Sequence, residues 1–339
     1  MRTLSLYLHI PWCIQKCPYC DFNSHKLSDE MNEDQYIDCL IADVDEHLLN
    51  ILSKQVNSIF LGGGTPSLFS AKALDRLLSY LSNKLHFSKN IEITLEANPG
   101  TVEQQRFKDY YAIGINRLSL GVQSFQDEKL KRLGRIHDAS EATNAITSLR
   151  KAGFENFNID IMHGLPKQSV EDAMFDLRTA LSFEPNHLSW YQLTIEPNTV
   201  FYKKPPMLPN EETLQQIEQG GFGLLNDHGL VRYEISAYAK EGFQSQHNLN
   251  YWRFGDYLGI GAGAHSKLTN DKNIVTRHWQ VRQPKDYMDT SKSFTSNKKT
   301  LDEQEIIFEY MMNVLRLYER QSLADFEKTT NLSRNKISK

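Results

Sequence analysis

The sequence lacks the features that would mark a membrane, secreted or nucleic-acid-binding protein. No apolar stretch approaches the roughly 18 residues of a membrane-spanning helix, and no basic N-terminal region followed by an apolar core predicts a signal peptide. The 38 Lys and Arg against 42 Asp and Glu give a net charge of −4, which argues against nucleic acid as the main partner. Cysteine is scarce, with four in 339 residues, so a reducing cytoplasm fits better than a disulfide scaffold.

Strand-like and helix-like segments alternate along the first 200 residues. Short apolar runs are followed by segments in which apolar residues recur every three or four positions, as in an amphipathic helix. This alternation with short links predicts right-handed βαβ units and a parallel sheet. Six units are fewer than the eight of a closed barrel, so we predict an α/β fold with an open, partial (β/α)6 barrel. The six strands are expected at residues 4–10, 56–61, 91–96, 115–122, 157–162 and 187–195.

The alternation breaks after residue 200. We expect residues 1–200 to form the core barrel, residues 201–300 to be an extension that covers it, and residues 301–339 to begin a small, mainly helical, winged-helix-like domain. The chain ends at Lys339 within a helical pattern, so this last domain is expected to be incomplete. Residues 258–264 match a G-x-G-x-x-A dinucleotide fingerprint, but no helical pattern follows, so we expect a loop near the barrel mouth.

Three of the four cysteines lie within eight residues, spaced C-x3-C-x2-C, directly after the first strand. Thiolates this close together favour one metal centre, and three of them leave a coordination position open. The alternatives are a zinc site completed by His25 or His9, a disulfide that leaves one cysteine over, or three unrelated buried cysteines. The fourth, Cys39, lies in a helical pattern and is expected to be a small core residue. The clustered cysteines are Cys13, Cys17 and Cys20.

Polar and glycine residues stand where the predicted strands end. Because the carboxyl ends of parallel strands meet at one mouth, we expect these residues to lie close together. Three glycines at 62–64 would let backbone groups approach a ligand, although a tight turn would also favour glycine. An acid or amide at one strand end is often a helix cap, but three at successive strand ends favour a ligand site: Glu96, Gln123 and Asp160.

The cysteine spacing together with GGGTP at residues 62–66 resembles the radical S-adenosylmethionine (SAM) superfamily, and YLHIPWC at residues 7–13 resembles its branch around oxygen-independent coproporphyrinogen III oxidase. The resemblance implies the same partial barrel and a [4Fe–4S] cluster held by the three clustered cysteines. It also implies that SAM chelates the fourth iron. The positions implied to contact SAM are Tyr7, Tyr19, Gly63, Gly64, Thr65, Glu96, Gln123, Arg135 and Asp160.

A second informative stretch is HNLNYW at residues 247–252. A lone histidine beside aromatic residues is usually a structural one. Here the string resembles the HNxxYW signature of one branch of the superfamily, the haem chaperones called HemW. Imidazole is a suitable axial ligand for haem iron. The resemblance therefore implies that His247 is a haem ligand.

One position separates the two branches. Coproporphyrinogen oxidases carry a further cysteine at the place of Phe22, and a longer N-terminal extension than this chain shows. We therefore expect a HemW-like haem chaperone that delivers haem to acceptor proteins, respiratory enzymes among them, and takes electrons from a donor. Peripheral membrane contact is compatible with such delivery. The alternative is an enzyme, an oxygen-independent coproporphyrinogen III oxidase that decarboxylates its substrate to protoporphyrinogen IX.

Overall fold

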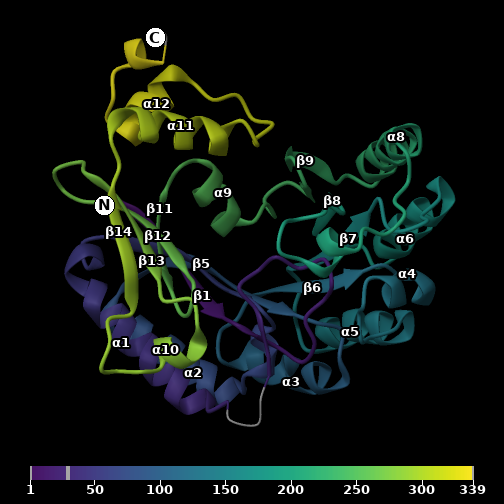
Figure 1. The fold of residues 1–339 in the computed structure, drawn as a ribbon, viewed down its shortest axis with the longest axis horizontal. Coiled ribbons are helices and arrows are strands. Elements are labelled where there is room, and N and C mark those ends of the chain that lie inside the picture. The colour runs from purple at the N-terminus through teal and green to yellow at the C-terminus, as the bar shows by residue number, and fades with distance from the viewer. Residues whose placement is uncertain (1, 28–30, 338–339) are drawn as a thin grey trace.

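The computed structural model describes residues 2–27 and 31–337, without the side chains of residues 101–104. The end of the chain at Lys339, where the sequence predicts an incomplete domain, lies outside the described residues. The protein is a mixed α/β structure built on a mainly parallel sheet of twelve strands, in the order β14-β13-β12-β11-β1-β4-β5-β6-β7-β8-β10-β9. Figure 1 shows helices on the outer side of this sheet and the C-terminal helices apart from them.

The six strands predicted from the sequence are present and parallel, and they neighbour one another in chain order. Their apolar residues, such as Leu6 and Leu61, are buried against the outer helices. Inward-facing side chains alternate with them, because successive residues of a strand point to opposite faces. These strands are β1 (Thr3–Ile10), β4 (Gln55–Gly63), β5 (His86–Ala97), β6 (Arg117–Gln123), β7 (Phe157–His163) and β8 (His187–Gln192).

The helices that connect and cover these strands follow the expected amphipathic patterns. Several begin at a side-chain cap, as where Asp138 and Glu141 form a reciprocal capping box. The covering helices are α1 (Glu33–Ile51), α2 (Ala71–Lys84), α3 (Thr101–Ala112), α4 (Asp127–Arg132), α5 (Ala139–Lys151) and α6 (Val170–Ser182), with the short turn η1 (Pro66–Leu68). Among the described residues, no helix has both the length and the apolar character needed to cross a membrane.

Residues 201–300 add strands to both edges of the same sheet. β9 (Val231–Glu234) and β10 (Ala237–Ala239) extend it antiparallel beyond β8. β11 (Asp256–Ile260) pairs parallel with β1, and an antiparallel meander follows, β12 (His265–Thr269), β13 (Val275–Gln280) and β14 (Thr295–Thr300). Four helices accompany them: α7 (Val200–Lys203), α8 (Glu211–Asp227), α9 (Gln246–Trp252) and α10 (Pro284–Tyr287).

The expectation of a loop at residues 258–264 is wrong for its first half. Residues 258–260 belong to β11, which is buried along its whole length beside β1. Glycine occurs there because the backbones approach closely: a Cβ on Gly259 would lie 2.1 Å from the carbonyl oxygen of His265, and one on Gly261 2.4 Å from that of His9. Only the second half, residues 261–264, lies outside the strands.

The described part of the C-terminal segment is helical. It consists of α11 (Glu303–Val314), α12 (Leu323–Thr330) and the turn η2 (Arg334–Lys336). Its apolar residues form a separate small cluster in which Tyr310 and Phe326 pack edge to face. The cluster includes Phe254, next to α9, so the segment packs against the part of the chain that carries the HNxxYW string.

Candidate functional site

Two adjoining cavities lie on the inner side of the sheet. The larger, which we call the central cavity, has a volume of about 1040 Å³ and is lined by residues of β1, β4–β8 and β11–β14, so the sheet curves around it. The smaller, which we call the cysteine cavity, has a volume of about 430 Å³. They share lining residues, among them Gly63, Glu96 and Asp160, and are therefore neighbours.

The three clustered cysteines all line the cysteine cavity. Their loop is closed at its base by the pairing of β2 (Trp12–Cys13) with β3 (His25–Lys26). The Lys16 ammonium group ties the loop internally, because it donates to the carbonyl oxygens of Phe22 at 2.9 Å and Ser24 at 3.2 Å. All three thiols are free and half-buried. Burial raises the pKa of Cys13 and of Cys20.

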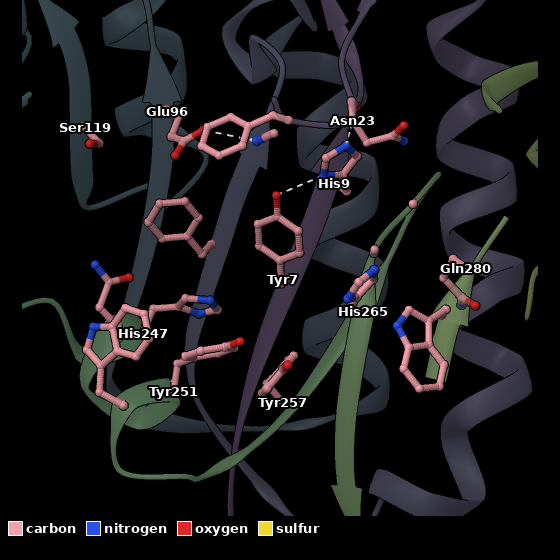
Figure 2. A pocket seen from close by; sticks show the side chains of 18 of the residues that line it. Tyr7, His9, Asn23, Glu96, Ser119, His247, Tyr251, Tyr257, His265 and Gln280 are labelled. Carbon is pink, nitrogen blue, oxygen red and sulfur yellow. Dashed lines mark hydrogen bonds between the residues drawn. The ribbon is translucent and has the colours of Figure 1, made fainter. Parts of the chain in front are cut away.

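The donor set suits an iron–sulfur cluster, because cysteine thiolates hold such clusters and all three thiols line one cavity. In a [4Fe–4S] cluster the thiolates bind different iron atoms. His9 is also committed elsewhere, to the Tyr7 hydroxyl at 2.9 Å and the Asn23 carbonyl oxygen at 3.0 Å (Figure 2).

Most residues expected to contact SAM lie around the same cavity. Tyr7 is the exception: it lines the central cavity instead. Arg135 does not lie in an exposed turn but points inward. Its guanidinium donates to Asn98 Oδ1 at 2.6 Å and the Gly121 carbonyl oxygen at 2.7 Å, and lies 3.7 Å from Cys17 Sγ. The expected residues that line the cysteine cavity are Tyr19, Gly63, Gly64, Thr65, Glu96, Gln123, Arg135 and Asp160.

The glycines after β4 are required by the packing of the cysteine loop. A Cβ on Gly64 would lie 2.4 Å from the Trp12 carbonyl oxygen, and Gly63 adopts φ +114°. The Gly63 N–H donates to Glu96 Oε2 at 3.1 Å, and the Thr65 N–H to the Trp12 carbonyl oxygen at 2.7 Å. The glycines therefore bring the end of β4 against the strand that carries Cys13. This packing explains them without a ligand.

Two carboxyl groups stand between the cavities. Burial, followed by the charge of Asp160, raises the pKa of Glu96 to about 8. Burial raises the pKa of Asp160 as well, although Asn158 and Ser119 donate to it at 2.7 and 3.2 Å. A cation placed here would favour the ionised form of both groups.

Gln123 adopts a backbone conformation that side chains other than glycine rarely take. Its φ is +70°, and its Oε1 accepts from the Tyr191 hydroxyl at 2.7 Å. Such a conformation costs on the order of 1–3 kcal/mol and occurs preferentially at functional sites. No sequence motif indicated Tyr191 or Asn98, which line the same cavity. Asn98 directly follows β5 and donates to Thr65 Oγ1 at 2.8 Å. The strand-end rule would have found Asn98.

His247 belongs to helix α9 and lines the central cavity (Figure 2). Ser245 caps this helix, and the Glu92 carboxylate accepts from the N–H groups of Gln246 and His247, both at 3.2 Å. The His247 ring packs 5.0 Å from the ring of Phe60, measured between centroids. Further aromatic residues line the same cavity: Tyr7, Tyr251, Trp252, Tyr257 and Trp279.

The imidazole of His247 is neutral. Burial, followed by the charge of Arg117, lowers the pKa of His247 to about 3. The Ser58 hydroxyl lies 2.7 Å from Ser5 Oγ and 3.3 Å from His247 Nδ1. A neutral imidazole keeps the lone pair of one ring nitrogen, and this is the form that binds a metal.

Comparisons with known proteins identify the family of this chain. Residues 7–179 match the Radical SAM superfamily. The chain is 50% identical to the heme chaperone HemW of Haemophilus influenzae over 99% of its length and 88% of that protein, and 49% identical to that of Escherichia coli over 99% and 89%. It is 36% identical to the heme chaperone HemW of Bacillus subtilis over 80% of its length and 72% of that protein.

The fold also matches a solved structure. Escherichia coli coproporphyrinogen III oxidase (HemN), described as a radical SAM enzyme, superimposes with a TM-score of 0.82 at 24% identity. The match covers 98% of this chain and 79% of that one. At this identity the likeness establishes the fold alone. Together, these comparisons show that the chain belongs to the radical SAM superfamily and, within it, to the family of the HemW proteins.

Proposed function

We propose that this protein is a haem chaperone: it binds haem in the central cavity and transfers it to acceptor proteins. The observation that carries the proposal is His247, a neutral imidazole in an aromatic-lined cavity of about 1040 Å³. Flat aromatic surfaces suit a porphyrin, and the volume is at the upper end of the range for ligand pockets. The relatives that share about half of the sequence are named as haem chaperones.

We further propose that the cysteine cavity holds a [4Fe–4S] cluster and SAM. The three clustered thiolates would bind three irons and leave the fourth to SAM, to which a reduced cluster can supply one electron. Glu96 and Asp160 suit the positive charge of SAM. Arg135 Nε is buried without a hydrogen-bond partner among the described residues, so this guanidinium has a donor left for a carboxylate. Gly63 and Gly64, at the end of β4, line the same cavity.

The remaining parts of the proposal concern architecture and partners. The parallel strands would form a partial (β/α)6 barrel over residues 1–200, residues 201–300 would extend it, and residues 301–339 would begin a winged-helix-like domain. The partners are haem-acceptor proteins, respiratory enzymes among them, and an electron donor, with peripheral membrane contact during delivery and no role for nucleic acid. A cytoplasmic location suits the free thiols.

The enzymatic alternative, oxidation of coproporphyrinogen III, gains no specific support. Phe22 occupies the position of the further cysteine in the oxidase pattern, and its side chain is 60% exposed where the two cavities meet. The likeness to the oxidase lies in the fold.

Haem binding and enzymatic turnover, measured on the same protein preparation, distinguish the two functions. The protein is reconstituted with iron and sulfide without oxygen, titrated with haem, and then assayed with coproporphyrinogen III, SAM and a reductant. The chaperone proposal predicts a stoichiometric Soret band and no turnover. Turnover at enzymatic rates, or the absence of haem binding by the cluster-loaded protein, would contradict it.

A further inference from the structure

Arg117 is a buried cation with few partners in the wall of the central cavity. It begins β6, its side chain is 2% exposed, and it lines the cavity together with His247. A guanidinium has five N–H donors. Among the described residues, Arg117 makes one long hydrogen bond, from Nη1 to Thr94 Oγ1 at 3.5 Å, and its Nε has no partner. Most of its donors are therefore unused.

The nearby acid Glu92 does not neutralise this cation well. Its Oε2 lies 4.0 Å from Arg117 Nε, at the outer limit of an ion pair. Both Glu92 oxygens also accept hydrogen bonds from helix α9, Oε1 from the His247 N–H and Oε2 from the Gln246 N–H, which orient the carboxylate toward that helix. Removing a charge from water costs several kcal/mol unless it is paired and hydrogen-bonded. A planar guanidinium in this state is suited to a bidentate carboxylate.

The polar neighbours of Arg117 are fixed by one another. His187 lies between Asn158 Oδ1 and the Tyr233 hydroxyl, at 2.7 Å from each. Asn158 in turn donates to Asp160 Oδ1 at 2.7 Å. Asn158, Asp160 and His187 line the cavity together with Arg117, which is a buried cation of this wall.

We propose that Arg117 binds a carboxylate of the tetrapyrrole that His247 ligates, and so selects porphyrins that carry free propionates. The inference rests on the proposed haem-binding function and deepens it. Both side chains line one cavity, with His247 available to the iron and Arg117 to an acidic substituent at the porphyrin edge. Arg282, at the rim of the same cavity, is exposed to solvent, so its charge is screened more strongly than that of the buried Arg117.

The test compares two probes, haem and haem dimethyl ester, which lacks the carboxylates. Affinities are measured by Soret titration of the cluster-loaded wild type, Arg117→Gln and Arg117→Lys. Arg76→Gln, which removes a surface arginine paired with Asp38 on the outer helices, is the matched control. Loss of a charge-assisted hydrogen bond predicts a fall of about ten- to a hundredfold in haem affinity for Arg117→Gln. Its affinity for the ester should stay unchanged, which also shows that the variant is folded.

The outcomes separate this inference from the function on which it rests. Preference for haem over its ester in the wild type and Arg76→Gln, lost in Arg117→Gln and partly kept in Arg117→Lys, supports the inference. Equal preference in the wild type and Arg117→Gln overturns it while the chaperone proposal stands. If Arg117→Gln loses affinity for SAM while its haem binding is unchanged, Arg117 binds the carboxylate of SAM and the inference is overturned. Absence of haem binding in the wild type overturns the proposed function and, with it, this inference.

Discussion

SAM binding should release a proton from Glu96. In the ligand-free protein, burial and the charge of Asp160 hold the pKa of Glu96 at about 8, so the group is mostly protonated at pH 7. The ammonium and sulfonium charges of SAM favour the carboxylate and lower this pKa. The free protein therefore binds more protons than the complex with SAM. For this reason SAM affinity falls as the pH drops below 8 and increases as the pH rises.

The magnitude follows from the titration equation. A pKa of 8 leaves about nine tenths of Glu96 protonated at pH 7, and a pKa of 7 leaves about half. Binding at pH 7 should therefore release between about half and about nine tenths of a proton per SAM. The apparent affinity should rise up to tenfold per pH unit between pH 6 and 7.

Isothermal titration calorimetry of cluster-loaded protein measures this release. Binding enthalpies are compared at pH 7 in two buffers whose ionisation enthalpies differ, and the difference gives the number of protons. Glu96→Gln is the control, because the amide keeps the shape and cannot titrate. Equal enthalpies in both buffers, or the same release from Glu96→Gln, would refute the assignment of this carboxyl group to SAM.

Three further predictions concern the cluster, the haem ligand and a buried ion network. Replacing any one of the three clustered cysteines by alanine should abolish the absorption near 400 nm after anaerobic reconstitution. Cys39→Ala is the control and should keep this absorption, since Cys39 is buried in α1. Retained absorption in a variant of a clustered cysteine would refute the ligand set. His247→Ala should weaken haem binding at least about tenfold. His228→Ala is the matched control, because His228 is exposed at the end of α8. Haem titrations of His247→Ala and the wild type that superimpose would remove His247 from the site. Asp256→Asn should lower the free energy of unfolding by about 3–5 kcal/mol, because it leaves two buried lysines without their shared carboxylate. Urea denaturation measures this loss, which should be absent from Asp289→Asn in an exposed loop.

The parallel part of the sheet was predictable because its strands are short apolar or alternating segments that lie between helical patterns. The strands after residue 255 were not. β11 is glycine-rich because neighbouring backbones approach it closely, a requirement that only the folded chain shows. β14 is largely exposed and polar, so its residues show no alternation that would indicate a strand.

The candidate site was predictable to a similar extent. The cysteines and the two acids, Glu96 and Asp160, follow from motif and topology, and the structure brings them to one cavity. The expectation that Asp160 ends its strand is wrong, because it lies in the middle of β7. His247 came from resemblance alone, because a single histidine carries no pattern. Arg117 was missed because it stands at the beginning of its strand, where strand-end reasoning does not look. Its isolation depends on Glu92 being bound to α9, which is a tertiary contact.

The electron paramagnetic resonance spectrum of the reduced, anaerobically reconstituted protein tests the central claim most directly. The claim is that the three clustered cysteines hold an iron–sulfur cluster whose fourth iron is open to SAM. We expect the signal of a reduced [4Fe–4S] cluster that changes when SAM is added. A protein that binds zinc in its place, or a cluster signal that SAM leaves unchanged, would contradict the account.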